Sequence, residues 1–534
     1  MKFSTRLISI TLFASLGLLV PVAGANVKCA SIFTDHMVLQ HDVPLPVWGT
    51  AEAGEAVTVK VGQQSKSATA DANGKWKVML DALPVGGPVK VEVAGKNAIV
   101  FDDVLVGDVW ICSGQSNMGF HLKQADNADA EIAAANFPNL RLFDVKHRTA
   151  DKPVDSVGGK WEPCTPKTVP MFSAVGYFFG RDIHQKIGIP IGLIHTSWGG
   201  TPAEAWTDLP TLQSDPDFAP ILGRLNNYPA QYPKDLARYE AAVEKQKSLP
   251  ADAKKPALRK PFPPDANPYL ATVLYNGMVA PLQPYAIKGV IWYQGEANTG
   301  RAAQYRKLLP AMIQDWRRTW AGGGSPSLLN ASDAKAAQPG NAFPFLIVQL
   351  ANYSANKPDG SSPWAELREG QWLTAAKTPN CGIAVTIDIG NPTNVHPTNK
   401  QEVGRRLGLV AEKMVYGRDV EDSGPTFASM AVDGNKVRVK FDHQAGGMEA
   451  RGGKLEGFTI AGEDQKFYPA EAAIEAGDAA GGQVIVLSSP DVAHPVAVRY
   501  GWANSPSCTL YNKANLPAPP FRTDDWPMVT AKAR

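Results

Sequence analysis

The sequence predicts an α/β protein in which a central domain of helices and buried strands is flanked on both sides by smaller, β-sandwich-like domains. Three observations support this prediction. Between 105 and 420, short apolar runs alternate with segments of helical period, as in sheets of mainly parallel strands. From 27 to 104 and from 421 to 534, short strand-like runs are separated by turn residues instead. The 48 glycines and 43 prolines supply many such turns.

The first 25 residues have the pattern of a secretory signal peptide. Lys2 and Arg6 precede an apolar stretch from Leu7 to Val22, and the small residues Ala23-Gly24-Ala25 follow it. A membrane anchor is the competing interpretation, but serine, threonine and proline residues interrupt the apolar stretch. We therefore expect a cleaved signal peptide at 1–25 and a secreted or periplasmic protein without a membrane anchor.

The two outer domains are predicted from short runs rich in valine and aromatic residues. In the N-terminal domain, 27–104, these runs are 44–47, 57–61, 76–80 and 89–93. In the C-terminal domain, 421–534, they are 437–441, 484–487 and 496–500. Each set is long enough to build a small sheet with one buried face.

The central domain, 105–420, is predicted to hold the active site, because sites in such sheets lie at the carboxyl ends of the strands. Its buried strands are expected at 109–112, 191–196, 290–293, 345–350 and 383–387. Its helices are expected at 305–316 and 403–414, where apolar residues repeat every three or four positions. The segment 208–267 is dense in proline and charge, with one helix expected around 236–247, and predicts an insertion.

Composition excludes several classes of ligand. The formal net charge is +2 without basic runs, so neither nucleic acid nor an anionic membrane is expected as a partner. No HExxH motif, Cys/His cluster or phosphate-binding glycine loop occurs, so we expect no metal and no cofactor. Export would permit one or two disulfides among the five cysteines, while Cys112 is expected to fill a buried strand position. The oligomeric state stays open.

A candidate nucleophile follows the first central strand. The apolar run from Trp110 to Cys112 continues directly into Gly114-Gln-Ser116-Asn117. A serine on a tight turn after a strand presents its hydroxyl to the carboxyl edge of the sheet. A strand that simply ends in a polar turn explains this segment equally well, so the segment alone does not decide.

Four ordered blocks resemble the SGNH hydrolase superfamily and, within it, the carbohydrate esterases of the sialate O-acetylesterase family. They are Gly114-Gln-Ser-Asn117, Gly192-Leu-Ile-His-Thr-Ser-Trp-Gly-Gly-Thr201, Ile291-Trp-Tyr-Gln-Gly-Glu-Ala-Asn298 and Val395-His-Pro-Thr-Asn-Lys-Gln401. The resemblance extends to 38–40, 511–513 and 520–526, and so covers nearly the whole mature chain. It implies a three-layer α/β/α hydrolase domain and a serine esterase that removes acetyl groups from carbohydrate through an acetyl-enzyme on Ser116.

The resemblance also implies an oxyanion hole for the charge that develops on the ester oxygen. Its donors would be the N–H of Ser116, the N–H of Gly199 or Gly200, and the side-chain amide of Gln294. Losing one such donor typically costs about 3 kcal/mol of transition-state stabilisation. An ordinary turn and a polar strand end are the competing interpretations of these glycines and of Gln294.

His396, in the fourth block, is expected to take the proton of Ser116 and return it to the departing sugar hydroxyl. Pro397 disfavours helix at the histidine and keeps it in a loop before the 403–414 helix. An imidazole at this position can titrate near neutral pH, which suits both roles.

The acidic member of a triad is left open by the sequence. The superfamily places an aspartate three residues before the histidine, and here that position is Thr393. Asp388, at the end of the preceding strand, is the candidate, and assistance by a backbone carbonyl is the alternative. The segment Asp491-Val-Ala-His494 has the right spacing, but it lies in the strand-rich C-terminal domain without a following helix.

Four residues are predicted to contact the substrate. Asn117 and Glu296 are candidates for sugar hydroxyls, Trp198 for stacking on a sugar ring, and Arg368 for a substrate carboxylate. The alternative for Glu296 is to orient a neighbouring donor, and no catalytic proton transfer is assigned to it. Core packing is the alternative for Trp198. His121 and His195, which lie close to the blocks, are expected to be packing or surface residues.

The implied substrate is an O-acetylated sugar or glycan. An O-acetylated sialic acid is the leading candidate by resemblance, and acetylated xylan or another plant polysaccharide is the alternative. A hypothesis of another class is a non-catalytic carbohydrate-binding protein, against which the intact blocks argue.

Overall fold

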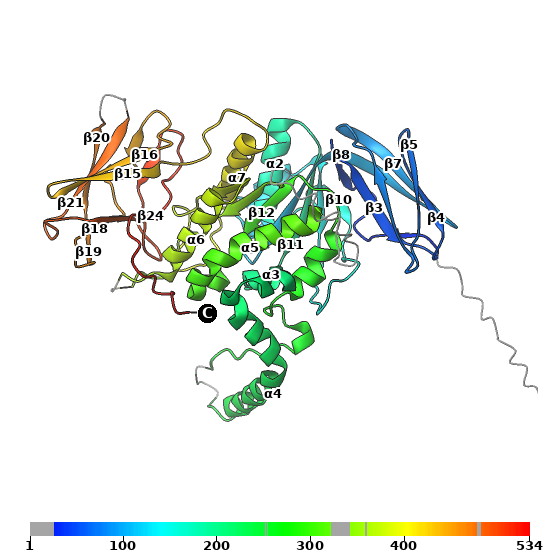
Figure 1. Cartoon of the computed structure of the whole chain (residues 1–534), viewed down its shortest axis with the longest axis horizontal. Helices are drawn as coiled ribbons and strands as arrows, with labels where there is room; N and C mark the ends of the chain where they lie inside the picture. Colours follow the sequence, from blue (N-terminus) through cyan, green and yellow to red (C-terminus); the bar gives the residue numbers. More distant parts are fainter. Residues whose placement is uncertain are drawn as a thin grey trace, which may run out of the picture.

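A central mixed sheet surrounded by helices, with antiparallel sheets at both ends of the molecule, makes up the fold (Figure 1). The computed structural model describes residues 26–250, 253, 255–321, 342–357, 360–477 and 482–533. The expected signal peptide at 1–25 lies outside these residues. Figure 1 places the N-terminal strands and the C-terminal strands on opposite sides of the central helices, with α4 projecting from the middle.

Seven strands form the central sheet, in the order β10-β9-β11-β8-β12-β13-β14. All neighbours are parallel except β10 and β9, which are antiparallel. The bounds are β8 (Ala98–Gly114), β9 (Phe137–Asp144), β10 (Trp161–Cys164), β11 (Ile191–Ser197), β12 (Gly289–Tyr293), β13 (Phe345–Val348) and β14 (Cys381–Ala384). Every residue of β11, β12 and β13 is buried, as expected for parallel strands covered on both faces.

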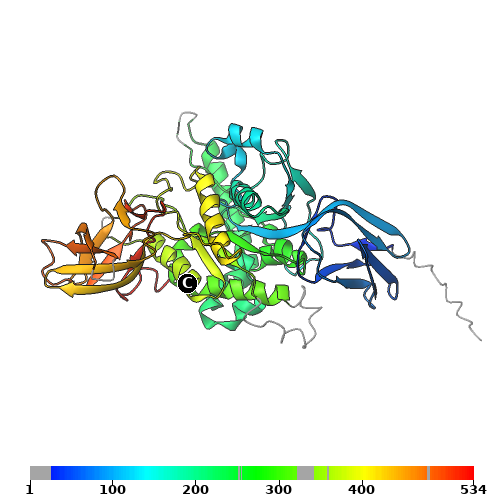
Figure 2. The same cartoon turned by 90° about the horizontal axis from the view of Figure 1, so that it is seen from above.

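Helices cover this sheet in two pairs. Helices α2 (Ala174–Ile187) and α7 (Lys400–Met414) pack together, as do α5 (Ala302–Ala321) and α6 (Pro363–Lys377). Figure 2 shows the pairs on opposite sides of the sheet. Helices α5 and α7 were predicted, whereas α6 was missed because its consecutive residues 365–368 are all buried, which removes the helical period from the sequence.

Strand β8 belongs to both the N-terminal strands and the central sheet. It pairs with β7 and β2 through its first half and with β11 and β12 through its second half. The predicted boundary at 104/105 therefore falls inside one continuous strand. Burial changes there: up to Asp103, exposed side chains alternate with half-buried or buried ones, and from Val104 onward all side chains are buried.

The predicted N-terminal strands are confirmed. Strands β1, β3 and β6 form one sheet, while β4 pairs with β5 and β7. The bounds are β1 (Lys28–Cys29), β2 (Val38–Gln40), β3 (Leu45–Thr50), β4 (Ala56–Val61), β5 (Gln64–Thr69), β6 (Lys75–Leu80) and β7 (Gly86–Ala94). Strand β5 was not predicted, because its sequence is polar and none of its residues is buried.

The C-terminal strands form the sheets β15-β16-β21-β20 and β19-β18-β22-β24 and the pair β17-β23. The bounds are β15 (Thr426–Asp433), β16 (Lys436–Asp442), β17 (Met448–Ala450), β18 (Phe458–Ala461), β19 (Phe467–Pro469), β20 (Glu471–Ala476), β21 (Gln483–Ser488), β22 (Ala497–Tyr500), β23 (Leu510–Asn512) and β24 (Phe521–Arg522). The three predicted runs lie in β16, β21 and β22. A separate apolar core fills this part of the chain.

The predicted insertion contains the long helix α4 (Ala219–Lys247), after the short helix α3 (Leu209–Ser214). Among the described residues, α1 (Ala128–Ala134) is the remaining α-helix. Helix α4 begins well before the predicted 236–247. Its first half was not predicted, because Pro229 and Pro233 lie inside it and proline is rare in the interior of a helix. All five cysteines are unpaired, so the permitted disulfides do not form, and Cys112 is buried in β8 as expected.

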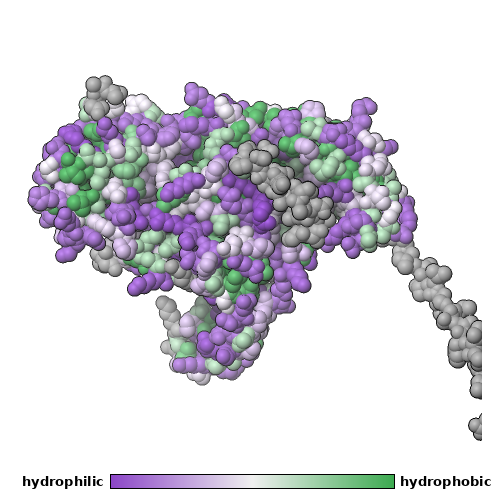
Figure 3. Space-filling model, viewed as in Figure 1, coloured by the Kyte–Doolittle hydropathy of each residue, from purple (hydrophilic) through white to green (hydrophobic). Residues whose placement is uncertain are grey.

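In the described part of the chain, no helix has both the length and the apolar character that a membrane span needs. The face of the molecule in Figure 3 is mostly hydrophilic, with hydrophobic side chains in small separate groups. Scattered groups of this kind are ordinary on a protein surface.

Candidate active site

The turn after β8 presents Ser116. Gly114 has φ of +139°, and a side chain at this position would collide with the carbonyl of Tyr293, so the tight turn requires glycine. The Gln115 N–H donates to the same Tyr293 carbonyl at 3.0 Å, which anchors the turn to β12. In the described residues the N–H of Ser116 has no acceptor. Ser116 itself is half-buried.

Ser116 and His396, which are 280 residues apart in sequence, meet at this edge of the sheet. The distance from Ser116 Oγ to His396 Nε2 is 2.8 Å. Two asparagines hold the histidine loop: the Asn394 side chain accepts from the His396 N–H at 3.0 Å, and Asn117 donates to the Val395 carbonyl at 2.9 Å. Burial and the nearby charge of Lys400 lower the pKa of His396, so its imidazole is neutral near pH 7 and can accept a proton.

Asp388 is not the partner of His396, which corrects the sequence-based expectation. Its carboxylate receives two hydrogen bonds from Arg406, at 2.6 and 2.7 Å, and one from the Tyr511 hydroxyl at 2.9 Å. Burial opposes ionisation of Asp388, but these partners outweigh burial and lower its pKa. Within the described ranges no carboxylate bonds to His396, and His494 lies exposed between β21 and β22.

Backbone amides form the candidate oxyanion hole. A Cβ added to Gly199 would lie 3.3 Å from the Ser116 Cβ, so glycine at 199 leaves the space beside the nucleophile open. Gly200 has φ of +77°, in the left-handed region that favours glycine. Both glycines are exposed, and their N–H groups, like that of Ser116, have no acceptor in the described structure.

Gln294 does not join these amides as a donor. Its side chain is fully buried, and its Nε2 donates to the Asn298 Oδ1 at 2.7 Å and to the Thr201 carbonyl at 3.2 Å. A primary amide has only two N–H donors, so none remains for substrate. Gln294 instead ties β12 to Thr201, the residue that follows the glycine turn.

Asn117 is buried and Glu296 is half-buried, and neither lines the cavity at Ser116, contrary to the predicted contact with sugar hydroxyls. Glu296 instead orients the Asn117 amide, which is the alternative given for it. Asn117 donates to Glu296 Oε1 at 2.6 Å and accepts from Lys400 Nζ at 2.6 Å. The Lys400 ammonium also lies 4.9 and 5.2 Å from the ring centres of Phe120 and Tyr293. Burial raises the pKa of Glu296 and lowers that of Lys400 to about 7.

Arg368 cannot reach a substrate carboxylate either. Its side chain is fully buried, and its guanidinium donates only to groups of this chain. The acceptors are the carbonyls of Leu350, Ala351, Ala503 and Asn504 and the Asn352 Oδ1. Arg368 therefore joins the central sheet to the C-terminal part of the chain.

Ser116 and His396 open into a cavity of about 580 Å³. The other residues that line it are Gly119, Phe120, His121, Gln124, Asp144, Val145, Lys146, His147, His195, Ser197 and Gly199. His121 and His195 are thus cavity residues, not merely packing or surface residues as expected. Trp198 stacks on the ring of His147, with ring centres 4.0 Å apart and an angle of 9° between the planes.

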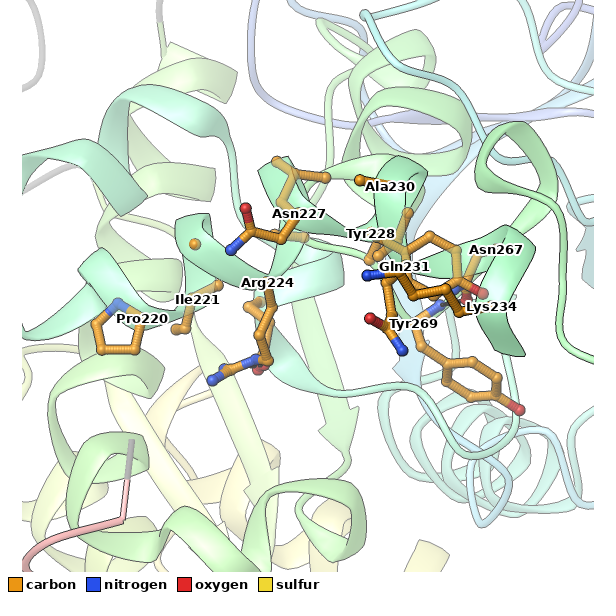
Figure 4. A pocket seen from close by; sticks show the side chains of 15 residues that line it. Pro220, Ile221, Arg224, Asn227, Tyr228, Ala230, Gln231, Lys234, Asn267 and Tyr269 are labelled. Atoms are coloured by element: carbon orange, nitrogen blue, oxygen red, sulfur yellow. Dashed lines mark hydrogen bonds and ion pairs between the residues drawn. The ribbon is translucent and has the colours of Figure 1, made fainter. Parts of the chain in front are cut away.

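A larger cavity, of about 910 Å³, lies between α4 and the segment Asn267–Ala271. In Figure 4, Tyr228, Gln231, Asn267 and Tyr269 gather at one end of this cavity. It adjoins the glycine turn, because a Cβ on Gly200 would lie 3.4 Å from the Tyr269 ring, while Gly199 faces Ser116. The two cavities therefore flank the same turn.

One group of side chains in the described residues has the spacing of a metal site. Ligand atoms of Glu421, Asp422 and His443 lie within 4.8 Å of one another. Lys413 pairs with Asp422 at 2.7 Å, so a lysine already neutralises part of this charge. None of these residues lines the cavity at Ser116.

Comparisons with known proteins relate the chain to carbohydrate acetylesterases. No family model matches the chain. It is 29% identical to the sialate O-acetylesterase of Rattus norvegicus, over 93% of this chain and 94% of that protein, and 29% identical to that of Homo sapiens, over 95% of each. A crystal structure of a carbohydrate acetylesterase from Xanthomonas citri is 38% identical, with a TM-score of 0.76 over 94% of this chain and 100% of that chain.

Proposed function

The chain belongs to the sialate O-acetylesterase family of carbohydrate acetylesterases, and from this premise we propose that it hydrolyses acetyl esters of sugars through an acetyl-enzyme on Ser116. One observation carries the proposal. Ser116 Oγ lies 2.8 Å from His396 Nε2 in an open cavity, beside backbone amides that have no acceptor in the described structure.

In the first half of the proposed reaction, Ser116 Oγ attacks the acetyl carbonyl while its proton moves to His396 Nε2. The amides of Ser116, Gly199 and Gly200 stabilise the negative charge on the carbonyl oxygen. The tetrahedral intermediate then collapses. The bond to the sugar oxygen breaks, His396 returns the proton to that oxygen, and the acetyl group stays on Ser116.

In the second half, water replaces the sugar. His396 accepts a proton from water as the water oxygen attacks the acetyl carbonyl, and the same amides stabilise the second intermediate. The bond to Ser116 Oγ then breaks, the proton returns to Oγ, and acetate leaves. Asn117 donates to the Val395 carbonyl and the Asn394 Oδ1 accepts from the His396 N–H, so these two bonds hold the backbone of the histidine loop, whereas in other triads a carboxylate orients the imidazole itself.

For the fold we propose an SGNH-type three-layer α/β/α domain at 105–420, with β domains at 27–104 and 421–534. The helix pairs on two sides of a mainly parallel sheet support this assignment. The pattern at 1–25 supports a secreted or periplasmic location. N-terminal sequencing of the mature protein from the exported fraction tests that location, and an intact Met1 there would contradict it.

The substrate proposal has two candidates. Family membership supports an O-acetylated sialic acid. The cavity of Figure 4 supports an acetylated polysaccharide such as xylan, because tyrosine and amide side chains next to the catalytic turn suit further sugar units. Arg368 supports neither candidate, since its guanidinium is enclosed by carbonyls.

Acetate release tests the proposal. Wild type and Ser116→Ala are compared on 4-nitrophenyl acetate, acetylated sialic acid and acetylated xylan. We expect Ser116→Ala to lose at least about a thousandfold in rate with unchanged circular dichroism. Equal rates for the two proteins would eliminate Ser116 as nucleophile, and a wild type without activity on any sugar ester would contradict the proposed substrate class.

A further inference from the structure

A second hydrogen-bonded chain of serine, histidine and aspartate lies in the wall of the cavity at Ser116. Ser197 Oγ is 2.7 Å from His195 Nε2, and His195 Nδ1 is 2.7 Å from Asp144 Oδ1. We propose that Asp144, His195 and Ser197 form a subsite that accepts a hydrogen bond from a free sugar hydroxyl and so places the acetyl ester at Ser116. This inference rests on the proposed function and adds a binding site to it.

Strand pairing brings the three residues together. Asp144 is the last residue of β9, and its register partner on β11 is His195. His195 and Ser197 are two positions apart on β11, so their side chains point to the same face of the sheet. All three therefore stand at the carboxyl edge of neighbouring parallel strands, the edge at which Ser116 follows β8.

The protonation states follow from the bonds. Burial raises the pKa of Asp144, but the hydrogen bond from His195 and the nearby Lys146 outweigh burial, and the net pKa is lowered. Ionised Asp144 accepts from His195 Nδ1–H, and in this Nδ1–H tautomer the Nε2 atom is an acceptor. The Ser197 hydroxyl then donates to Nε2.

Ser197 Oγ keeps its own lone pairs available. In the described residues no other group donates to it, and Ser197, although only 4% exposed, lines the cavity of about 580 Å³. Gly119 makes the hydroxyl reachable, because a Cβ added at Gly119 would lie 2.8 Å from Ser197 Oγ. Asp144 adds a second acceptor on the same wall, with about half of its side chain exposed. The wall therefore suits a ligand that carries hydroxyl donors.

Attack by Ser197 itself is excluded by its surroundings. An acyl-transfer serine needs free amides beside it, and the following amide is the usual one. The Trp198 N–H already donates to the Gly114 carbonyl at 3.2 Å, which continues the pairing of β11 with β8. Ser116, in contrast, stands beside amides without acceptors. Asp144, His195 and Ser197 therefore bind the substrate, and Ser116 and His396 carry out the reaction.

A comparison of substrates with and without sugar hydroxyls tests the subsite. Ser197→Ala removes the acceptor, and Gly119→Ala covers it without removing it. Ser113→Ala is the control, because Ser113 is a buried serine of β8 whose Oγ has no hydrogen-bond partner in the described structure. Rates are measured on 4-nitrophenyl acetate, which has no sugar hydroxyl, and on acetylated xylan and 9-O-acetylated N-acetylneuraminic acid.

We expect Ser197→Ala and Gly119→Ala to lower the ratio of kcat/KM on the sugar ester to kcat/KM on 4-nitrophenyl acetate roughly tenfold, the loss of about one ordinary hydrogen bond. Equal losses on both kinds of ester, or no loss on either, would overturn the subsite while the proposed function stands. A wild type that cleaves only 4-nitrophenyl acetate would overturn both. Ser113→Ala should match wild type on every ester.

Discussion

Replacing Lys400 by methionine should stabilise the protein below neutral pH. The Lys400 side chain is buried, and among the residues that the structure describes its ammonium donates to one oxygen, the Asn117 Oδ1. Methionine keeps much of the length of the stem and removes the charge. The substitution therefore removes a desolvation penalty and leaves Asn117 with an unpaired acceptor.

The magnitude follows from the pKa of Lys400, which burial lowers from 10.5 to about 7. That difference of about 3.5 in pKa corresponds to a penalty of about 5 kcal/mol at pH 6, where the lysine is charged in both the folded and the unfolded chain. Between pH 7 and 10.5 the unfolded chain binds the extra proton, so the stability of wild type rises with pH. At pH 9 the remaining penalty is about 2 kcal/mol.

Guanidinium unfolding, followed by tryptophan fluorescence at pH 6 and pH 9, measures the effect. The cost of the unpaired Asn117 is about 1–3 kcal/mol at either pH, so we expect a net gain of about 2–4 kcal/mol at pH 6. The gain should be about 3 kcal/mol smaller at pH 9. Lys90→Met, at an exposed ion pair with Asp102, is the control and should leave the unfolding midpoint unchanged at both pH values, because water screens exposed pairs. A gain that does not depend on pH would refute the reasoning.

Three further predictions concern activity. Lys400→Met should move the acid limb of the pH–rate profile of 4-nitrophenyl acetate hydrolysis to higher pH, because the Lys400 charge helps to lower the pKa of His396; an unmoved limb would contradict this coupling. Gly199→Ala should lower kcat on the same ester about a hundredfold with unchanged folding, because its Cβ would lie 3.3 Å from the Ser116 Cβ and crowd the space that the ester carbonyl needs beside the nucleophile; wild-type kcat would refute the need for open space at position 199. Asp388→Asn should cost about 3 kcal/mol of unfolding free energy, because it breaks the buried pair with Arg406, and should leave that acid limb in place; a large loss of kcat at full stability would restore Asp388 as the third triad member.

The local sequence was enough to predict which residues lie at the edge of the sheet. The run from Trp110 to Cys112 predicts the strand that carries Ser116, and Pro397 predicts a loop for His396 ahead of a helix. Both inferences use neighbours within a few positions, where apolar period and proline geometry act directly. The same reasoning found most strands of the outer domains.

Partners of buried polar groups could not be predicted, because they depend on which distant segments pack together. Asp388 bonds to Arg406 and Tyr511, and Arg368 to carbonyls more than 130 positions away. Lys400 is buried because Phe120 and Tyr293, from two other segments, close over it.

The hydrogen-bonded group of Asp144, His195 and Ser197 shows both what the sequence can predict and what it cannot. The spacing of His195 and Ser197 is visible in the sequence and places both side chains on one face of a strand. The pairing of β11 with β9, which supplies Asp144, is visible only in the folded sheet. Sequence determined which groups this protein can present at the edge of its sheet, and tertiary structure decided which of them face one another, because hydrogen bonds form only between groups that packing brings within about 3 Å.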